Sequence, residues 1–323
     1  MRLSPRDCCR EIAMSRPLSM VILIAVVMGI AILTGCSGSG PFVSTTRLQA
    51  LEHNSRGVEA ESRGSRDLAR SEFSMALQLS SSIDDADGTV VALLNLSRLS
   101  RRGNALAVAE TYMQRALSRA SAVPGRNVDV AFEMTLLLLA QGETESAKIT
   151  AQRAVELSTE KNRAACYNLL ARVEHQLGDD AGAETHARHA LAAIADEADL
   201  VEAANAYRLL GELAMTSGRQ DESVQFFKEA LTRDKVAGIS PRIAGDLRFL
   251  ARLANAAGNS PEAINYWHRA FEVSLSGGDR KAALEDLAAM AEICRKSGDK
   301  VQTDALERQR LELSGEDSGA LSP

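Results

Sequence analysis

The sequence predicts an all-α solenoid of about seven helix-turn-helix units, and three observations support this fold class. Seven glycines recur at intervals of 39, 39, 36, 40, 40 and 40 residues. Each separates two segments of helical apolar periodicity, as expected where antiparallel helices meet at a tight turn. Proline is scarce, with only seven in 323 residues, and a fixed period of this length is typical of stacked supersecondary units. The turn glycines are Gly64, Gly103, Gly142, Gly178, Gly218, Gly258 and Gly298.

The second helix of six of the expected units carries two small residues seven positions apart. Residues at this spacing share one helix face, where small side chains let a neighbouring helix approach closely. A large apolar residue lies between them in four units, whereas Ala151 and Ala187 take that position in two others. The large residues are Phe73, Met113, Phe227 and Trp267. The small pairs are Ala69 and Ala76, Ala109 and Ala116, Ala147 and Ala154, Ala183 and Ala190, Ser223 and Ala230, and Ala263 and Ala270.

Three units carry a fuller pattern of bulky and small residues. The fifth unit has Tyr207, Leu210, Gly211 and Ala214, then Ser223, Phe227, Ala230 and Leu231. The fourth has Tyr167, Leu170 and Ala171, then Ala183, Ala190 and Leu191, and the sixth has Leu250, Ala251 and Ala254, then Ala263, Trp267 and Ala270. In these residues the chain resembles the tetratricopeptide repeat (TPR) family, over about residues 50–312. The resemblance implies a right-handed superhelix of stacked helical hairpins.

The chain differs from the TPR pattern in its period, which is near 40 residues instead of about 34. The additional residues fall between units, as in segments 193–204 and 232–243. This spacing resembles the long repeats of kinesin light chains, with either lengthened helices or ordered loops between units. The seventh unit turns polar after Gly298, which predicts a terminal cap because no further repeat covers that face.

The amino terminus carries a second signal, an apolar run over residues 18–33. Its sixteen residues are short for a membrane span, which needs about 20, and are typical of a signal-peptide core. The run leads into Leu-Thr-Gly-Cys at 33–36, which resembles a bacterial lipobox. The resemblance implies that Cys36 is the lipidated first residue of the mature protein. The alternative is a plain membrane anchor followed by a chance cysteine.

The sequence therefore predicts four segments. They are a lipoprotein signal peptide at 1–35, a lipidated cysteine with a flexible tether at 36–49, the solenoid at 50–312, and a disordered tail at 313–323. Acidic and cysteine residues before Met14 are unusual for a signal peptide, so Met14 is an alternative start. By resemblance to other lipoproteins, Ser37 favours the outer membrane, facing the periplasm, over the inner membrane.

Charge and cysteine content exclude two classes of protein. The formal net charge is −6, and without residues 1–35, which hold four basic and two acidic residues, it is −8. This acidity argues against non-specific nucleic-acid binding. After Cys36 only Cys166 and Cys294 remain. They lie three units apart, too far for the ~7 Å limit on Cα separation in a disulfide, so both are expected to be buried, free thiols.

Motifs for catalysis are absent from the sequence after residue 36. It contains no Walker A loop, dinucleotide-binding glycine fingerprint, HExxH, CxxC or G-x-S-x-G turn. We therefore expect neither an enzyme nor a bound cofactor. His186 and His189, with His175 on the preceding helix, form the most metal-like group. Without a carboxylate or thiol in a suitable position, we expect them to be solvated surface histidines.

The TPR resemblance implies that the first helices line a concave surface, into which the second, fifth, ninth and twelfth positions of each unit point. Arginine and asparagine are concentrated there. Arginine pairs with carboxylates in a bidentate geometry and asparagine can bond a peptide backbone, so the groove would suit an extended acidic segment or a chain terminus. Alternatively, the arginines pair with neighbouring glutamates on a solvated helix face. The candidate partner-binding residues are Arg98, Arg101, Asn168, Arg172, Asn205, Arg208, Arg248, Arg252 and Asn255.

The third unit differs, because Phe132, Leu136 and Leu139 take the inner positions. They could anchor an apolar side chain of a partner, although we favour ordinary core. Together these features predict a membrane-tethered scaffold for a protein partner, which by fold and anchor resembles pilotins and assembly factors of envelope, secretion or pilus systems. The alternatives are a scaffold for cell-wall or polysaccharide machinery and an enzyme of unknown type.

Overall fold

The computed structural model describes residues 43–194 and 199–315, and its regular structure over these ranges is entirely helical. The first helices of the units are α2 (Thr45–Ser62), α4 (Ala86–Arg102), α6 (Asn127–Gln141), α8 (Arg163–Gln176), α10 (Leu200–Thr216), α12 (Ser240–Ala256) and α14 (Arg280–Ser297). The second helices are α3 (Arg66–Ser82), α5 (Leu106–Ala120), α7 (Thr144–Leu157), α9 (Asp180–Ala192), α11 (Gln220–Ala237), α13 (Ser260–Ser276) and α15 (Lys300–Ser314). A 3₁₀ turn, η1 (Pro124–Arg126), precedes α6.

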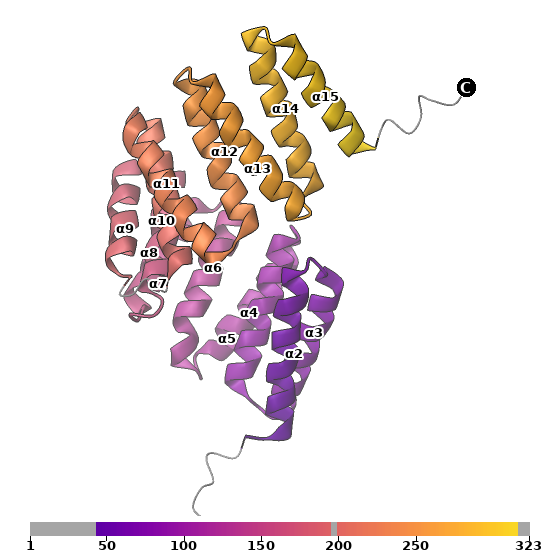
Figure 1. The fold of residues 1–323 in the computed structure, drawn as a ribbon. Helices are drawn as coiled ribbons and strands as arrows, with labels where there is room; N and C mark the ends of the chain where they lie inside the picture. The colour runs from indigo at the N-terminus through magenta and orange to yellow at the C-terminus, as the bar shows by residue number, and fades with distance from the viewer. Residues whose placement is uncertain (1–42, 195–198, 316–323) are drawn as a thin grey trace, which may run out of the picture.

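Seven antiparallel hairpins stack into a curved array, with α2 and α3 at one end and α14 and α15 at the other (Figure 1). This confirms the all-α solenoid of about seven units. The apolar run, Cys36 and the tail from residue 316 lie outside the described residues. In the described ranges, no helix is both long and apolar enough to cross a membrane.

The turns inside the hairpins form largely as the glycine spacing predicts. Six of the seven turn glycines have φ between 73° and 83°, a conformation that costs glycine little. The exception is Gly103, whose φ is −85°, while the following Asn104 takes the positive φ of 60°. Asparagine tolerates this conformation better than most residues, so the turn moves by one position.

The small residues of the second helices form the contacts that hold each hairpin together. Every member of the six pairs has a relative exposure of 0%. Phe73, Met113 and Phe227 are likewise fully buried between them. The two phenylalanine rings lie against glycines of the paired first helix. A Cβ at Gly57 would come within 2.5 Å of Phe73, and one at Gly211 within 2.9 Å of Phe227. These positions therefore need residues without a side chain.

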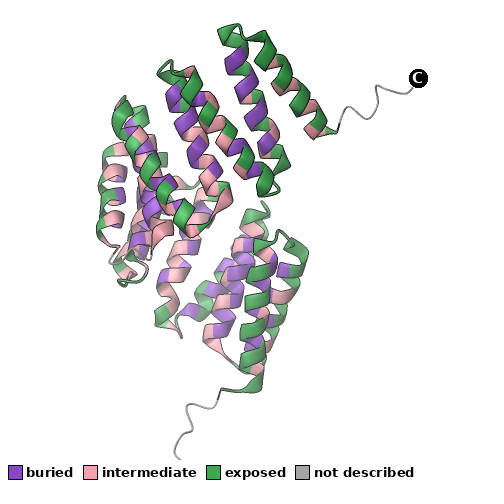
Figure 2. Cartoon of the chain, viewed as in Figure 1, coloured by how far each residue is buried: buried purple, intermediate pink, exposed green. Residues whose placement is uncertain are grey.

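The last unit closes the array. Trp267 packs against a cluster shared by units six and seven, as expected, but its side chain is only partly buried. No residue of α15 is buried, in keeping with a terminal cap. In Figure 2, α14 carries buried residues, whereas α15 is coloured only as exposed or intermediate.

The longer period comes mostly from longer helices. α11 runs to Ala237 and α12 begins at Ser240, so segment 232–243 is almost all helical. α9 and α10, in contrast, are joined through residues 193–199. The solenoid also begins earlier than expected, because α2 starts at Thr45 and includes five residues that we had given to the tether. Cys166 and Cys294 are buried, free thiols, as predicted.

Candidate functional site

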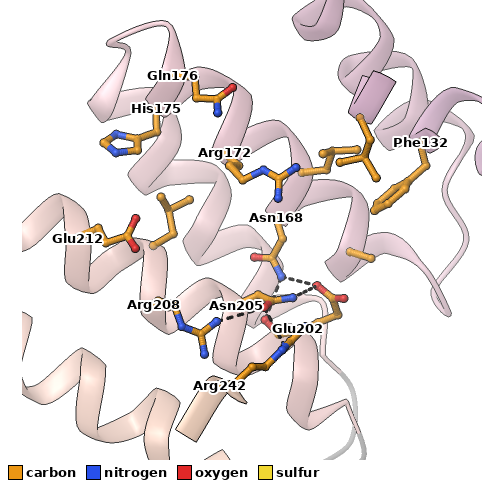
Figure 3. A pocket seen from close by; sticks show the side chains of 14 residues that line it. Phe132, Asn168, Arg172, His175, Gln176, Glu202, Asn205, Arg208, Glu212 and Arg242 are labelled. Carbon is orange, nitrogen blue, oxygen red and sulfur yellow. Dashed lines mark hydrogen bonds between the residues drawn. The ribbon is translucent and has the colours of Figure 1, made fainter. Parts of the chain in front are cut away.

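A cavity of about 500 Å³ opens on the inner surface of the array, between α6, α8, α10 and α12 (Figure 3). Phe132 and Leu136 from α6 form part of its wall, whereas α8, α10 and α12 supply most of the polar groups. The first helices thus line the inner surface, and the cavity gathers four of the nine candidate residues. Its polar lining residues are Asn168, Arg172, His175, Gln176, Glu202, Asn205, Arg208, Glu212 and Arg242.

Arg208 is already paired within the protein. Its Nε donates to Asp246 Oδ1 at 2.8 Å, and one terminal nitrogen donates to Asp234. Both carboxylates have an exposure of 0%, and the Arg208 side chain is only 20% exposed. Replacement of Arg208 would therefore be costly to stability, because it would leave two buried carboxylates without their cation.

The same arrangement recurs forty residues later. Arg248 donates to both oxygens of Asp286, at 2.6 and 2.8 Å, and to Ser274 Oγ at 2.7 Å. Arg101 likewise pairs with Glu133 of the next first helix, with Nε and Oε1 2.9 Å apart. These arginines form ion pairs between successive units, so the alternative of internal pairing describes them better than a continuous free basic track.

Two asparagines form a second polar network at the floor of the cavity. Asn168 Nδ2 donates to the backbone oxygen and to Oε2 of Glu202, at 2.9 and 2.8 Å. Asn205 donates to the same carboxylate, and its own oxygen accepts from Arg208 and Arg242 (Figure 3). These acceptors orient the Asn168 amide, whose buried Oδ1 is left without a hydrogen-bond partner.

Arg172 differs from the paired arginines. It projects into the cavity one helical turn beyond Asn168 and forms no hydrogen bond or ion pair with any described residue. Loss of water around the side chain lowers the pKa of its guanidinium, and the charge of Arg101 lowers it further. The cavity therefore presents an uncompensated cation.

Glu212, on the opposite wall, likewise forms no hydrogen bond within the part of the chain that the structure describes. Burial raises the pKa of this carboxyl, while the charges of His175, Arg208 and Arg252 act in the opposite direction. The groove thus has one free cation in α8 and one free acid in α10, so a ligand that places an anion and a hydrogen-bond donor on these two walls would compensate both.

Two neighbouring cavities extend this inner surface. One, of about 350 Å³, contains Arg98 and Arg101 and shares Phe132 and Leu136 with the central cavity. The other, of about 720 Å³, contains Arg252 and shares His175 and Glu212 with it. The three cavities form an inner groove along α4 to α12, with Phe132 and Leu136 as an apolar ridge between two basic regions.

The remaining candidate residues make fewer polar contacts within the protein. Arg98 bonds Asn95 and lies 3.7 Å from Glu61. The Arg252 guanidinium lies 4.2 Å from the centre of the Phe249 ring and has no carboxylate partner, while Asn255 is exposed. Our preference for core in the third unit was correct for Leu139, which packs in a core cluster. Phe132 also packs against a core cluster while it lines the groove, and Leu136 lines the groove.

The histidines form hydrogen bonds with carboxylates and contacts between rings. His175 pairs with Asp180 at 2.7 Å and His186 with Glu174 at 2.6 Å, while Tyr167 lies beside His186 and His189. Among the residues that the structure describes, no group of three or more potential ligands could hold a metal ion.

Comparison with known proteins places the fold. Residues 162–235 match the tetratricopeptide repeat family, and no curated protein sequence matches the chain. Among solved structures, PilW, a widely conserved type IV pilus biogenesis factor, is 17% identical, with a TM-score of 0.53 over 68% of this chain and 91% of PilW.

Two further structures are similar. PilF of Pseudomonas aeruginosa is 16% identical, with a TM-score of 0.51 over 76% of this chain and 100% of PilF. RapI without ligand is 12% identical, with a TM-score of 0.64 over 86% of this chain and 78% of RapI. At these identities the likeness concerns the fold, which is a TPR-like solenoid, a scaffold suited to protein–protein interaction.

The two kinds of inner arginine should respond differently to mutation. Arg208→Ala leaves two buried carboxylates without their cation and should lower the free energy of unfolding by about 3–5 kcal/mol. Arg172→Ala removes no internal partner and should change it by less than about 0.5 kcal/mol. Urea denaturation followed by circular dichroism measures both. Equal losses in the two variants would contradict the assignment of Arg208 as a structural pair.

Asp246 should make stability depend on pH. Burial raises the pKa of this carboxyl from 3.8 to about 6, and the charge of Asp234 adds to the effect, while Arg208 opposes it. Since the folded state binds this proton more tightly, the contribution is fully present below pH 4 and is lost as pH rises through 6. Relative to Asp246→Asn, the wild type should therefore lose up to roughly 3 kcal/mol between pH 4 and 7. Parallel stability profiles of the two proteins over this range would contradict the prediction.

Proposed function

We propose that this protein is a membrane-anchored scaffold that holds an extended segment of a protein partner in its inner groove. The observation that carries the proposal is Arg172, an exposed guanidinium beside the apolar ridge of Phe132 and Leu136 that pairs with none of the described residues. Arg101 and Arg208, which also line the groove, are paired with carboxylates of the protein itself. Arg172 is therefore the cation beside the apolar ridge that is available to a ligand, while Arg252, whose guanidinium lies over the Phe249 ring, is a second one in the neighbouring cavity.

The geometry suits an extended peptide with an acidic group next to an apolar side chain. Arg172 can donate two parallel hydrogen bonds to a carboxylate. Phe132 and Leu136 can cover the apolar side chain, as buried anchors do in protein interfaces. A C-terminal carboxylate would satisfy Arg172 equally well.

The proposed location is the cell envelope. The lipobox-like segment ending at Cys36 supports a lipid anchor, and Ser37 supports the outer membrane, facing the periplasm. The fold similarity to PilW and PilF supports a pilotin-like or assembly role in a pilus or secretion system. This assignment rests on shared fold together with the anchor, because the sequence identities are low.

Arg172→Glu should weaken partner capture. A photo-crosslinking amino acid at Leu136 is expected to trap the partner in the native envelope, and mass spectrometry identifies it. Reversing the charge at Arg172 should lower the crosslinked yield about tenfold, the equivalent of roughly 1.4 kcal/mol, because the partner carboxylate would meet a like charge.

The matched control is Arg153→Glu on α7, which changes the net charge equally at a site that is 61% exposed and pairs only with Glu156. If both variants lose the same yield, only the overall charge of the protein matters. If Arg172→Glu binds normally, the partner does not use this groove.

Cys36 should carry the lipid. Metabolic labelling with a fatty acid is expected to mark the wild-type protein and Cys166→Ala, whose buried thiol is unavailable. Cys36→Ala should lose the label and accumulate as an unprocessed precursor. Label retained in Cys36→Ala would refute the lipoprotein assignment.

A further inference from the structure

The two ends of the solenoid differ in what they expose. At the carboxyl end, α15 is a mainly polar helix without a buried residue. At the amino end, α2 carries Leu48, Leu51 and Val58, which are 54%, 54% and 48% exposed. Several aliphatic side chains exposed to this extent on one helix indicate a surface that contacts another molecule or a membrane.

The three residues lie along one side of α2. Ser55 completes the series 48, 51, 55 and 58, whose steps of three and four residues trace a single helix face. No charged residue falls in this series, whereas Glu52, Arg56 and Glu59 lie on the neighbouring faces. We call Leu48, Leu51, Ser55 and Val58 the α2 stripe.

The repeat explains why the stripe is open. Forty residues after Leu48 lies Gly88 of α4, which packs so closely on the preceding unit that a Cβ there would come within 2.5 Å of Ser80 Oγ. Forty residues after Ser55 and Val58 lie Asn95, which bonds Asn54 of α2, and Arg98, which is 3.7 Å from Glu61, so this side of a first helix faces both helices of the unit before it. In the described part of the chain no unit precedes α2, so the stripe lacks the cover that α4 receives from α2 and α3.

The sequence before α2 indicates what covers the stripe. The apolar run at 18–33 and Cys36 place the membrane attachment a few residues upstream. Nine residue steps separate Cys36 from Thr45 and can span at most about 30 Å. α2 is therefore the helix held nearest to the bilayer.

We propose that α2 lies on the bilayer surface, with Leu48, Leu51 and Val58 inserted at the boundary between headgroups and acyl chains. This proposal rests on the anchor in the proposed function. Aliphatic side chains that project from one side of a helix can insert at the boundary between headgroups and acyl chains. Three side chains already about half covered cannot supply the ~800 Å² per partner of a stable protein interface. A tethered surface contact needs far less area, because the anchor already provides a high local concentration of lipid.

The test uses the full lipidated chain in vesicles of phosphatidylethanolamine and phosphatidylglycerol. An environment-sensitive fluorophore is attached to Leu51→Cys, and for comparison to Val301→Cys on α15, which is 81% exposed. Cys166 and Cys294 are buried and should not react. At position 51 emission should shift to shorter wavelength and be quenched by spin-labelled lipid, whereas at position 301 neither effect is expected.

A double variant tests the stripe itself. Leu48→Glu with Leu51→Glu should abolish quenching of a fluorophore at Val58→Cys while leaving the melting temperature and the lipid modification unchanged. The matched control is Val108→Glu with Leu117→Glu on α5, where the residues are 49% and 45% exposed. This control should leave quenching intact.

Each other outcome overturns the inference. An acylated Cys36 with position 51 in water refutes the bilayer contact alone, and the anchor stands. Crosslinking between copies at position 51 without lipid quenching would assign the stripe to a dimer instead. An unmodified Cys36, detected from the mass of the amino-terminal peptide, would refute both the anchor and the contact.

Discussion

The close approach of paired helices, made possible by residues with little or no side chain, is the constraint on which the solenoid depends. Alanine or serine fills both small positions of the second helix in six of the seven units, and each is completely buried. Where Phe73 and Phe227 lie between them, the facing first helix has Gly57 and Gly211 in contact with the rings. Because this fit is local to each hairpin, the same solution can repeat along the chain with a change of length but not of architecture.

A second layer of interactions joins one unit to the next. Arg101, Arg208 and Arg248 each reach a carboxylate on the following first helix. Buried pairs of this kind contribute little net stability, yet removal of one partner is costly. Their main consequence for the groove is selective. They neutralise Arg101 and Arg208 within the groove, whereas Arg172 faces the apolar ridge and forms no ion pair with any described residue.

The sequence predicted the repeat better than the site. Glycine spacing and buried small residues depend on local geometry, so they located every hairpin, with a one-residue shift at Gly103. The partners of Arg208 were missed because Asp234 and Asp246 lie 26 and 38 residues away and meet it only through packing. A signal was present, since Asp246 and Asp286 are separated by the same forty residues as Arg208 and Arg248. Phe132 and Leu136 could not be placed, because an apolar residue at an inner position fits both core and groove.

The fluorescence of the single tryptophan reports on the carboxyl end of the solenoid only. Trp267 packs in the cluster where units six and seven meet and remains partly accessible to water. Its emission therefore follows the docking of the last hairpin, whereas far-ultraviolet circular dichroism follows the helices of the whole array. In a chain held together by contacts between neighbours, terminal units open more readily than central ones. The separation between the two unfolding curves thus measures fraying at the carboxyl end without any added label.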